Sequence, residues 1–182
     1  MVSAAFVAPF LADTTNSFLL AAARLPGVRL GLVTTASLDQ VPAEIRHALA
    51  GHYQVQDGLD PQQIADGVRG LAGQIGEVER LVAILEQLQV PLGQVRDGLG
   101  IPGMGEAVAL NVRDKARMKD ELRRHGLPCA RHKVIRTWAD AEACLAEIGL
   151  PLVLKPPAGM GCKATWRVRA VDELRAALTA IH

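Results

Sequence analysis

The stretch LPLVLKPPAGMGCKATWRVR, residues 150–169, joins an apolar segment, a glycine-rich segment and an alternating segment. The apolar residues at 151–155 predict a strand that ends on a lysine. Further on, Trp166 and Val168 alternate with polar residues, which is typical of a strand with one buried face. The stretch therefore predicts two strands joined by a glycine-rich loop.

The loop between these strands has features of a phosphate-binding site. Gly159 and Gly161 allow backbone conformations that a side chain would disfavour, and they let N–H groups approach a ligand closely. Lys155 and Lys163 place an ammonium group at each end of the loop, which favours bound phosphate. The loop is not a Walker motif, because G-x-x-x-x-G-K-[ST] is absent and a strand follows where that motif needs a helix. An ordinary hairpin with a flexible tip is the alternative interpretation.

The first hundred residues alternate between short apolar runs and segments with helical character. This order predicts a parallel sheet covered by helices on both faces, and so a small doubly wound α/β domain that ends near residues 100–103. The turn after the first strand, residues 9–17, lacks G-x-G-x-x-G, which argues against NAD or FAD. The predicted strands lie at 4–8, 28–33, 52–56 and 78–84, and the predicted helices at 17–25, 42–50, 61–75 and 90–98.

The second segment begins with a basic helix, for which we predict Asn111 as N-cap and an end near His125. Because cations are unfavourable in the first turns of a helix, we hypothesise that Lys115 faces a nucleotide phosphate or a purine nitrogen. A solvated basic surface helix is the alternative. Downstream we predict a strand at 133–135, a helix capped by Thr137 that buries Cys144, and a last helix from about 171.

Composition excludes several classes of function. The 182 residues fit one large or two small domains, and a net charge of +1 with 3% aromatic residues argues against nucleic-acid binding. No run approaches the roughly 18 apolar residues that span a bilayer, so we expect no membrane segment. The three cysteines form no C-x-x-C pair, which favours a reducing, cytoplasmic location. Cys129 and His132 lack a second ligand pair at zinc-site spacing, so we predict no metal site.

The order of motifs resembles the ATP-grasp superfamily. An Asp-Lys pair at 114–115 is followed by Gly-Leu-Pro at 126–128 and again at 149–151, then by Val-Leu-Lys-Pro at 153–156 and the glycine loop. Upstream, Glu86 and the sequence LGIPG at 99–103 resemble the end of the family's pre-ATP-grasp domain. The resemblance covers about residues 78–178.

The resemblance implies a Rossmann-like pre-ATP-grasp domain with a parallel sheet at 1–110, followed by the first α+β lobe of an ATP-grasp domain at 111–182. It implies that Lys115 and Lys155 contact ATP and that the loop closes over the phosphates. The loop residues implied to bind the nucleotide are Gly159, Met160, Gly161, Cys162 and Lys163. The implied enzyme is an ADP-forming ligase that phosphorylates a carboxylate or bicarbonate for attack by an amine or other nucleophile.

The family's Mg²⁺ ligands and its adenine-binding hinge would lie beyond residue 182, so we expect a truncated chain that does not turn over ATP alone. No catalytic residue is assigned. Biotin carboxylase-like, carbamoyl-phosphate synthase-like and amino-acid ligase-like members stay open, with a slight preference for the first. The alternative function is a non-catalytic dimerisation or interaction module, and a homodimer is compatible with either. Nucleic-acid binding through residues 113–136 is a third, minor alternative, which would show a steep salt dependence.

Overall fold

A computed structural model describes residues 1–161 and 163–181 of the chain. The chain divides into two compact units, Met1–Leu110 and Asn111–His182. Each unit has its own hydrophobic core, which is what an independently folding unit requires. Among the residues described, no helix is both long and apolar enough to cross a membrane.

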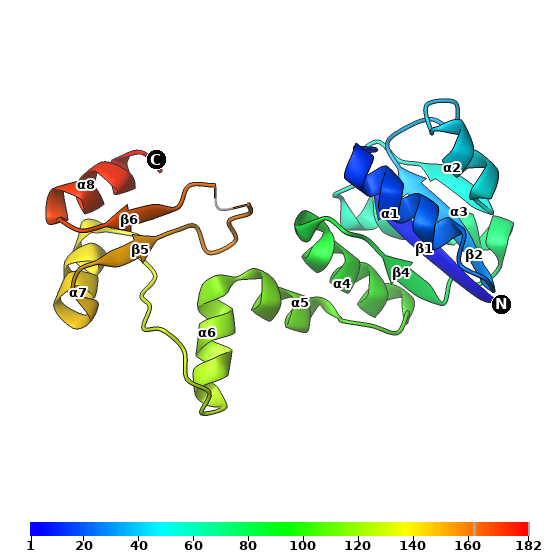
Figure 1. The fold of residues 1–182 in the computed structure, drawn as a ribbon. Helices are drawn as coiled ribbons and strands as arrows, with labels where there is room; N and C mark the ends of the chain where they lie inside the picture. The colour runs from blue at the N-terminus through cyan, green and yellow to red at the C-terminus, as the bar shows by residue number, and fades with distance from the viewer. Residues whose placement is uncertain (162, 182) are drawn as a thin grey trace. The chain divides into compact units, whose positions relative to one another are not determined.

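The first unit is built on a four-stranded parallel sheet with the strand order β3-β2-β1-β4 (Figure 1). The fold class is therefore α/β with a parallel sheet, as the alternation of strands and helices predicts. Leu32 and Val33 of the second strand are fully buried, because a parallel sheet of this kind is covered on both faces. The strands are β1 (Val2–Ala8), β2 (Val28–Thr34), β3 (Gly51–Gln54) and β4 (Arg80–Val82).

Helices cover both faces of this sheet, and each face has a separate apolar cluster. Phe6 and Leu19 belong to the cluster beneath the first two helices, whereas Val7 and Leu71 belong to the cluster on the other face. Adjacent residues of β1 thus point to opposite faces, as the pleat of a strand dictates. The helices are α1 (Asp13–Ala23), α2 (Ala43–Ala48), α3 (Pro61–Ile75) and α4 (Gln89–Leu99), with a 3₁₀ turn η1 (Glu86–Leu88) before α4.

A close helix contact in the first unit gives a stability prediction. A Cβ atom added to Gly93 in α4 would lie 2.8 Å from the Cα and N atoms of Glu106, which are backbone atoms. We expect Gly93→Ala to cost about 1–3 kcal/mol through overpacking. By contrast, an added Cβ at Gly98 of the same helix meets nothing within 4 Å. We expect Gly98→Ala to gain about 0.5–1 kcal/mol, because alanine is the better helix former.

Urea unfolding of both variants, followed by far-UV circular dichroism, measures this difference. Gly98→Ala serves as the matched control, since it makes the same chemical change in the same helix. If the two substitutions changed the free energy of unfolding by the same amount, the close packing of α4 at Gly93 would be contradicted.

The second unit is an α+β arrangement. Strands β5 (Leu152–Leu154) and β6 (Trp166–Val168) form a two-stranded antiparallel sheet, with Val153 opposite Arg167. Its core contains Ala141, Val168 and Leu174, with both tryptophans packed against them. The last two helices both contribute to this core, through Ala141 and Leu174. The helices are α5 (Glu106–Arg113), within which the division between units falls, α6 (Lys115–Arg124), α7 (Trp138–Ile148) and α8 (Val171–Thr179).

The predicted start of the basic helix is wrong. Asn111 lies inside α5, and a separate helix begins at Lys115. Asp114 is its N-cap: the side chain accepts hydrogen bonds from the backbone N–H groups of Ala116 (2.8 Å) and Arg117 (3.1 Å). Asp114 has extended backbone angles, which break the helical run that the sequence pattern predicted as continuous.

The predicted strand at 133–135 is also wrong, because the segment has no regular structure and pairs with none of the strands in the described residues. Its apolar residues instead serve packing, and Ile135 lies against the core of the second unit. The segment is fastened to the end of α7 by Arg131, which donates to the carbonyl oxygens of Glu147 (2.8 Å) and Ile148 (3.3 Å). The capping box of Thr137 and the burial of Cys144 match the prediction.

Candidate functional site

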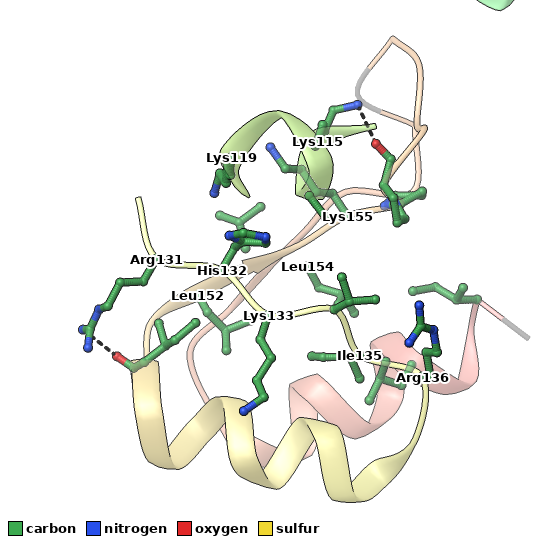
Figure 2. Close-up of a pocket in the computed structure, with 18 of the residues that line it drawn as sticks. Lys115, Lys119, Arg131, His132, Lys133, Ile135, Arg136, Leu152, Leu154 and Lys155 are labelled. Carbon is green, nitrogen blue, oxygen red and sulfur yellow. Dashed lines mark hydrogen bonds between the residues drawn. The ribbon is translucent and has the colours of Figure 1, made fainter. Parts of the chain in front are cut away.

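A pocket of about 860 Å³ lies within the second unit, between α6, the segment 130–138, β5 and the end of α8 (Figure 2). This volume is in the range of small-molecule sites. No aspartate or glutamate occurs among the described residues that line the pocket. The basic side chains that line it are Lys115, Lys119, Arg131, His132, Lys133, Arg136, Lys155 and Arg175.

The pocket also has an apolar wall. Ile135, Leu152 and Leu154 line it and pack against the core of the second unit. Trp138 lines it as well, and the guanidinium carbon of Arg175 lies 4.0 Å from the centre of a Trp138 ring. An apolar wall beside a group of cations suits a ligand with both an apolar or aromatic part and an anionic part.

Lys115 is held at the N-terminus of α6 by the glycine loop. Its backbone N–H donates to the carbonyl oxygen of Pro157 (3.0 Å), and its ammonium group donates to the carbonyl oxygens of Gly159 (2.9 Å) and Pro157 (3.4 Å). Arg113 donates to the same Gly159 oxygen at 3.3 Å. A phosphate oxygen that binds Lys115 would therefore take the place of a loop carbonyl.

Lys155 follows β5 directly and lines the same pocket as Lys115. Its side chain is exposed. Within residues 1–161 and 163–181, its ammonium group has no hydrogen-bond or ion-pair partner. Lys155 is thus a cation that a ligand can reach without displacing a protein group.

None of the other predicted loop residues that the structure describes lines the pocket wall. The Gly159 carbonyl oxygen accepts a hydrogen bond from Lys115, which lines the pocket. Met160, Gly161 and Lys163 are absent from the lining of the pocket. The loop turns through hydrogen bonds from the Gly159 N–H to the Pro156 carbonyl and from the Lys163 N–H to the Met160 carbonyl. Cys162 lies outside the described residues.

The loop contains two residues with left-handed backbone angles. Gly161 has a φ of +58° and Ala164 a φ of +51°. Glycine adopts this region without cost, but alanine does so rarely. The backbone at Ala164 thus has a conformation that glycine favours.

His132 lines the pocket beside charged groups of α6. Its Nδ1 accepts from Nη1 of Arg123 (2.8 Å), and its Nε2 lies 3.5 Å from Oδ1 of Asp120. Partial burial, the Arg123 cation and the Lys119 ammonium lower its pKa, against the opposing effect of Asp120. The imidazole is therefore neutral at pH 7, with its proton on Nε2.

Sequence reasoning missed Lys119 and His132 as site residues. A signal for Lys119 was present, because it follows Lys115 by four positions and so lies on the same helix face. His132 comes from a segment without regular structure, and nothing in the sequence places it beside α6. Among the described residues, no three His, Cys, Asp or Glu side chains are grouped as metal ligands.

Comparison with known proteins finds ligases that are similar to this chain. No family model matches the chain. It is 29% identical over 115 residues to an alanine–anticapsin ligase of Bacillus subtilis, with 63% of this chain and 24% of that protein aligned. It is 34% identical over 107 residues to a D-alanine–D-alanine ligase of Cupriavidus taiwanensis, with 59% and 30% aligned.

Solved structures match the fold over nearly the whole chain. The biotin carboxylase domain of a Hydrogenobacter thermophilus 2-oxoglutarate carboxylase, solved with MgADP, ADP and bicarbonate, has a TM-score of 0.76 at 20% identity. That match covers 98% of this chain and 40% of the other. An L-amino acid ligase of Bacillus licheniformis has a TM-score of 0.74 at 19% identity, with 100% and 42% covered.

These comparisons confirm the resemblance: the chain is similar to the N-terminal part of ATP-grasp ligases. It spans about a quarter to a third of the length of the curated relatives, and about two fifths of the structural neighbours.

Proposed function

We propose that the chain is the N-terminal part of an ATP-dependent, ADP-forming ligase, and that residues 111–182 form one wall of its nucleotide site. The observation that carries the proposal is the pocket that Lys115 and Lys155 both line, with no carboxylate among its described lining residues. Residues 1–110 would then be the Rossmann-like pre-ATP-grasp domain, and residues 111–182 the first lobe of the ATP-grasp domain. We infer the cytoplasm as its location.

Catalysis of phosphoryl transfer rests largely on positioning the phosphates and neutralising their charge. In this proposal, Lys155 and Lys115 donate charge-assisted hydrogen bonds to phosphate oxygens. Lys115 exchanges its hydrogen bond to the Gly159 carbonyl for one to a phosphate oxygen. The loop is then free to cover the phosphates with Gly159, Met160, Gly161, Cys162 and Lys163. The substrates of the whole enzyme would be a carboxylate or bicarbonate and an amine or other nucleophile.

When bound, Mg²⁺ would help to neutralise the negative charge of the phosphates. The lining of the described pocket is basic and offers no carboxylate oxygen, which Mg²⁺ prefers as a ligand. Its protein ligands would therefore lie outside this pocket, in the complete enzyme. We propose for the same reason that the chain binds ATP but does not hydrolyse it at a significant rate alone.

Titration of the chain with ATP tests the proposal. Trp138 lines the pocket, so intrinsic fluorescence reports its occupancy, and calorimetry gives the affinity. We expect saturable binding with a Kd within or below the range of about 1 µM to 1 mM that is usual for enzyme substrates. Adenosine should bind more weakly, because it lacks the phosphates that meet the lysines.

A negative result has a clear meaning in this experiment. If neither calorimetry nor fluorescence detects ATP binding by the folded chain, the nucleotide-site proposal is wrong, and the non-catalytic interaction module becomes the better account. Magnesium-dependent release of ADP by the pure chain would contradict only the proposed inactivity.

A further inference from the structure

Lys119 lies one helical turn after Lys115 on α6 and lines the same pocket. Residues four apart on a helix share a face, and the rise along the axis is about 6 Å. Within the described part of the chain, the Lys119 ammonium group has no hydrogen-bond or ion-pair partner. The proposed nucleotide function above assigns Lys119 no role.

Several other cations of the pocket are already engaged by the protein. Arg131 donates to two carbonyl oxygens at the end of α7, Lys133 pairs with Glu147 at 3.1 Å, and Arg175 stacks on Trp138. Figure 2 shows Arg131 directed away toward a carbonyl oxygen, whereas Lys119 and Lys155 lie at the α6 side of the pocket. Lys119 and Lys155 thus present their charges to the same space.

Among the described residues that line the pocket, no carboxylate stands beside Lys119 as a counter-charge. Its neighbour Asp120 is shared with Arg123 (3.7 Å) and His132 (3.5 Å). The Lys119 charge also lowers the pKa of His132, which favours the neutral imidazole. A half-buried cation without a partner is unfavourable unless an anion joins it.

We propose that Lys119 is a third phosphate-binding lysine of the nucleotide site, acting with Lys115 and Lys155. The inference rests on the proposed function, because it assumes that the pocket receives a nucleotide. It adds a binding residue to that function. A triphosphate has several charged oxygens along its length, and lysines one helical turn apart match such an extended anion.

The test compares Lys119→Met with Arg117→Met. Arg117 is two positions away on α6, is exposed and does not line the pocket, so its removal makes the same change in net charge without touching the site. We expect Lys119→Met to weaken ATP binding by about 3- to 10-fold, in line with one partly solvated charge-assisted hydrogen bond. Lys119→Arg should retain most of the affinity, and adenosine affinity should be the same in all variants.

The outcomes separate the two proposals. If the unmodified chain binds ATP but Lys119→Met equals Arg117→Met, Lys119 is not a phosphate ligand and only this inference is wrong. If Lys119→Met lowers adenosine and ATP affinity equally, its role is structural, which also overturns the inference. If the unmodified chain does not bind ATP, both the proposed function and this inference are wrong.

Discussion

Replacing Lys155 with methionine is expected to weaken ATP binding by about 10- to 100-fold. Hydrogen bonds to charged groups contribute about 1.5–3 kcal/mol, and each 1.4 kcal/mol changes affinity tenfold. Lys155 is a sharper test than Lys115, because its ammonium group has no partner among the described residues and its removal breaks no hydrogen bond to them. Calorimetric titration with ATP measures the effect.

Lys115→Met is harder to interpret. It removes the hydrogen bonds to Gly159 and Pro157 as well as any phosphate contact, so it also alters the loop. Arg167→Met is the matched control for Lys155, since Arg167 is an exposed cation on the adjacent strand that does not line the pocket. Equal affinities of the Lys155 and Arg167 variants for ATP would show that Lys155 does not bind phosphate.

The fold of the first unit was largely predictable, because local signals agreed with one another. Helix α3 shows this best: Asp60 and Pro61 define its start, and it ends before Gly76, which has a φ of +79°. Two of its internal glycines, Gly67 and Gly70, have a packing reason, because an added Cβ would meet side chains of the sheet. A Cβ at Gly70 would lie 2.2 Å from the ring of Tyr53, so the sheet approaches the helix too closely for a side chain.

The second unit was less predictable, because the apolar residues at 133–135 pack against its core without pairing as a strand. The segment 133–135 has the composition of a strand, yet its place beside β5 is decided by Arg131 and by burial of Ile135. Periodicity alone cannot distinguish these cases. The predicted helix start at Asn111 was wrong because two helices, α5 and α6, adjoin here, and only the extended backbone of Asp114 separates them.

The candidate site likewise combines residues that motifs predicted with residues that only the tertiary structure places there. Lys115 and Lys155 were identified by motifs, and the structure brings them to one pocket although they are 40 positions apart. Lys163 carries the same charge in the same loop but does not line that pocket. Lys119 belongs to no motif, and only its spacing of four residues from Lys115 indicates the site. His132 joins the site only because the segment 130–138 packs near α6. A motif thus marks which residues to consider, while tertiary packing decides which of them share a site.

Leu174→Ala should destabilise the second unit by about 2–5 kcal/mol. Leu174 is fully buried in the core with Ala141 and Val168, and removing its side chain leaves a cavity beneath the two-stranded sheet. The chain has two tryptophans, Trp138 and Trp166, and both pack against this core. Tryptophan fluorescence during urea unfolding therefore reports the second unit.

Far-UV circular dichroism in the same titration reports the helices of both units. We expect Leu174→Ala to shift the fluorescence transition to lower urea and to leave a dichroism transition of the first unit unchanged, because the cores are separate. Val171→Ala, at an exposed position of the same helix, should change stability by no more than about 0.5 kcal/mol. If both transitions moved together, the units would unfold as one, and affinity lost in a pocket variant could then reflect damage anywhere in the chain. Separate transitions would instead allow each loss of ATP affinity to be assigned to the second unit, where the lysines lie.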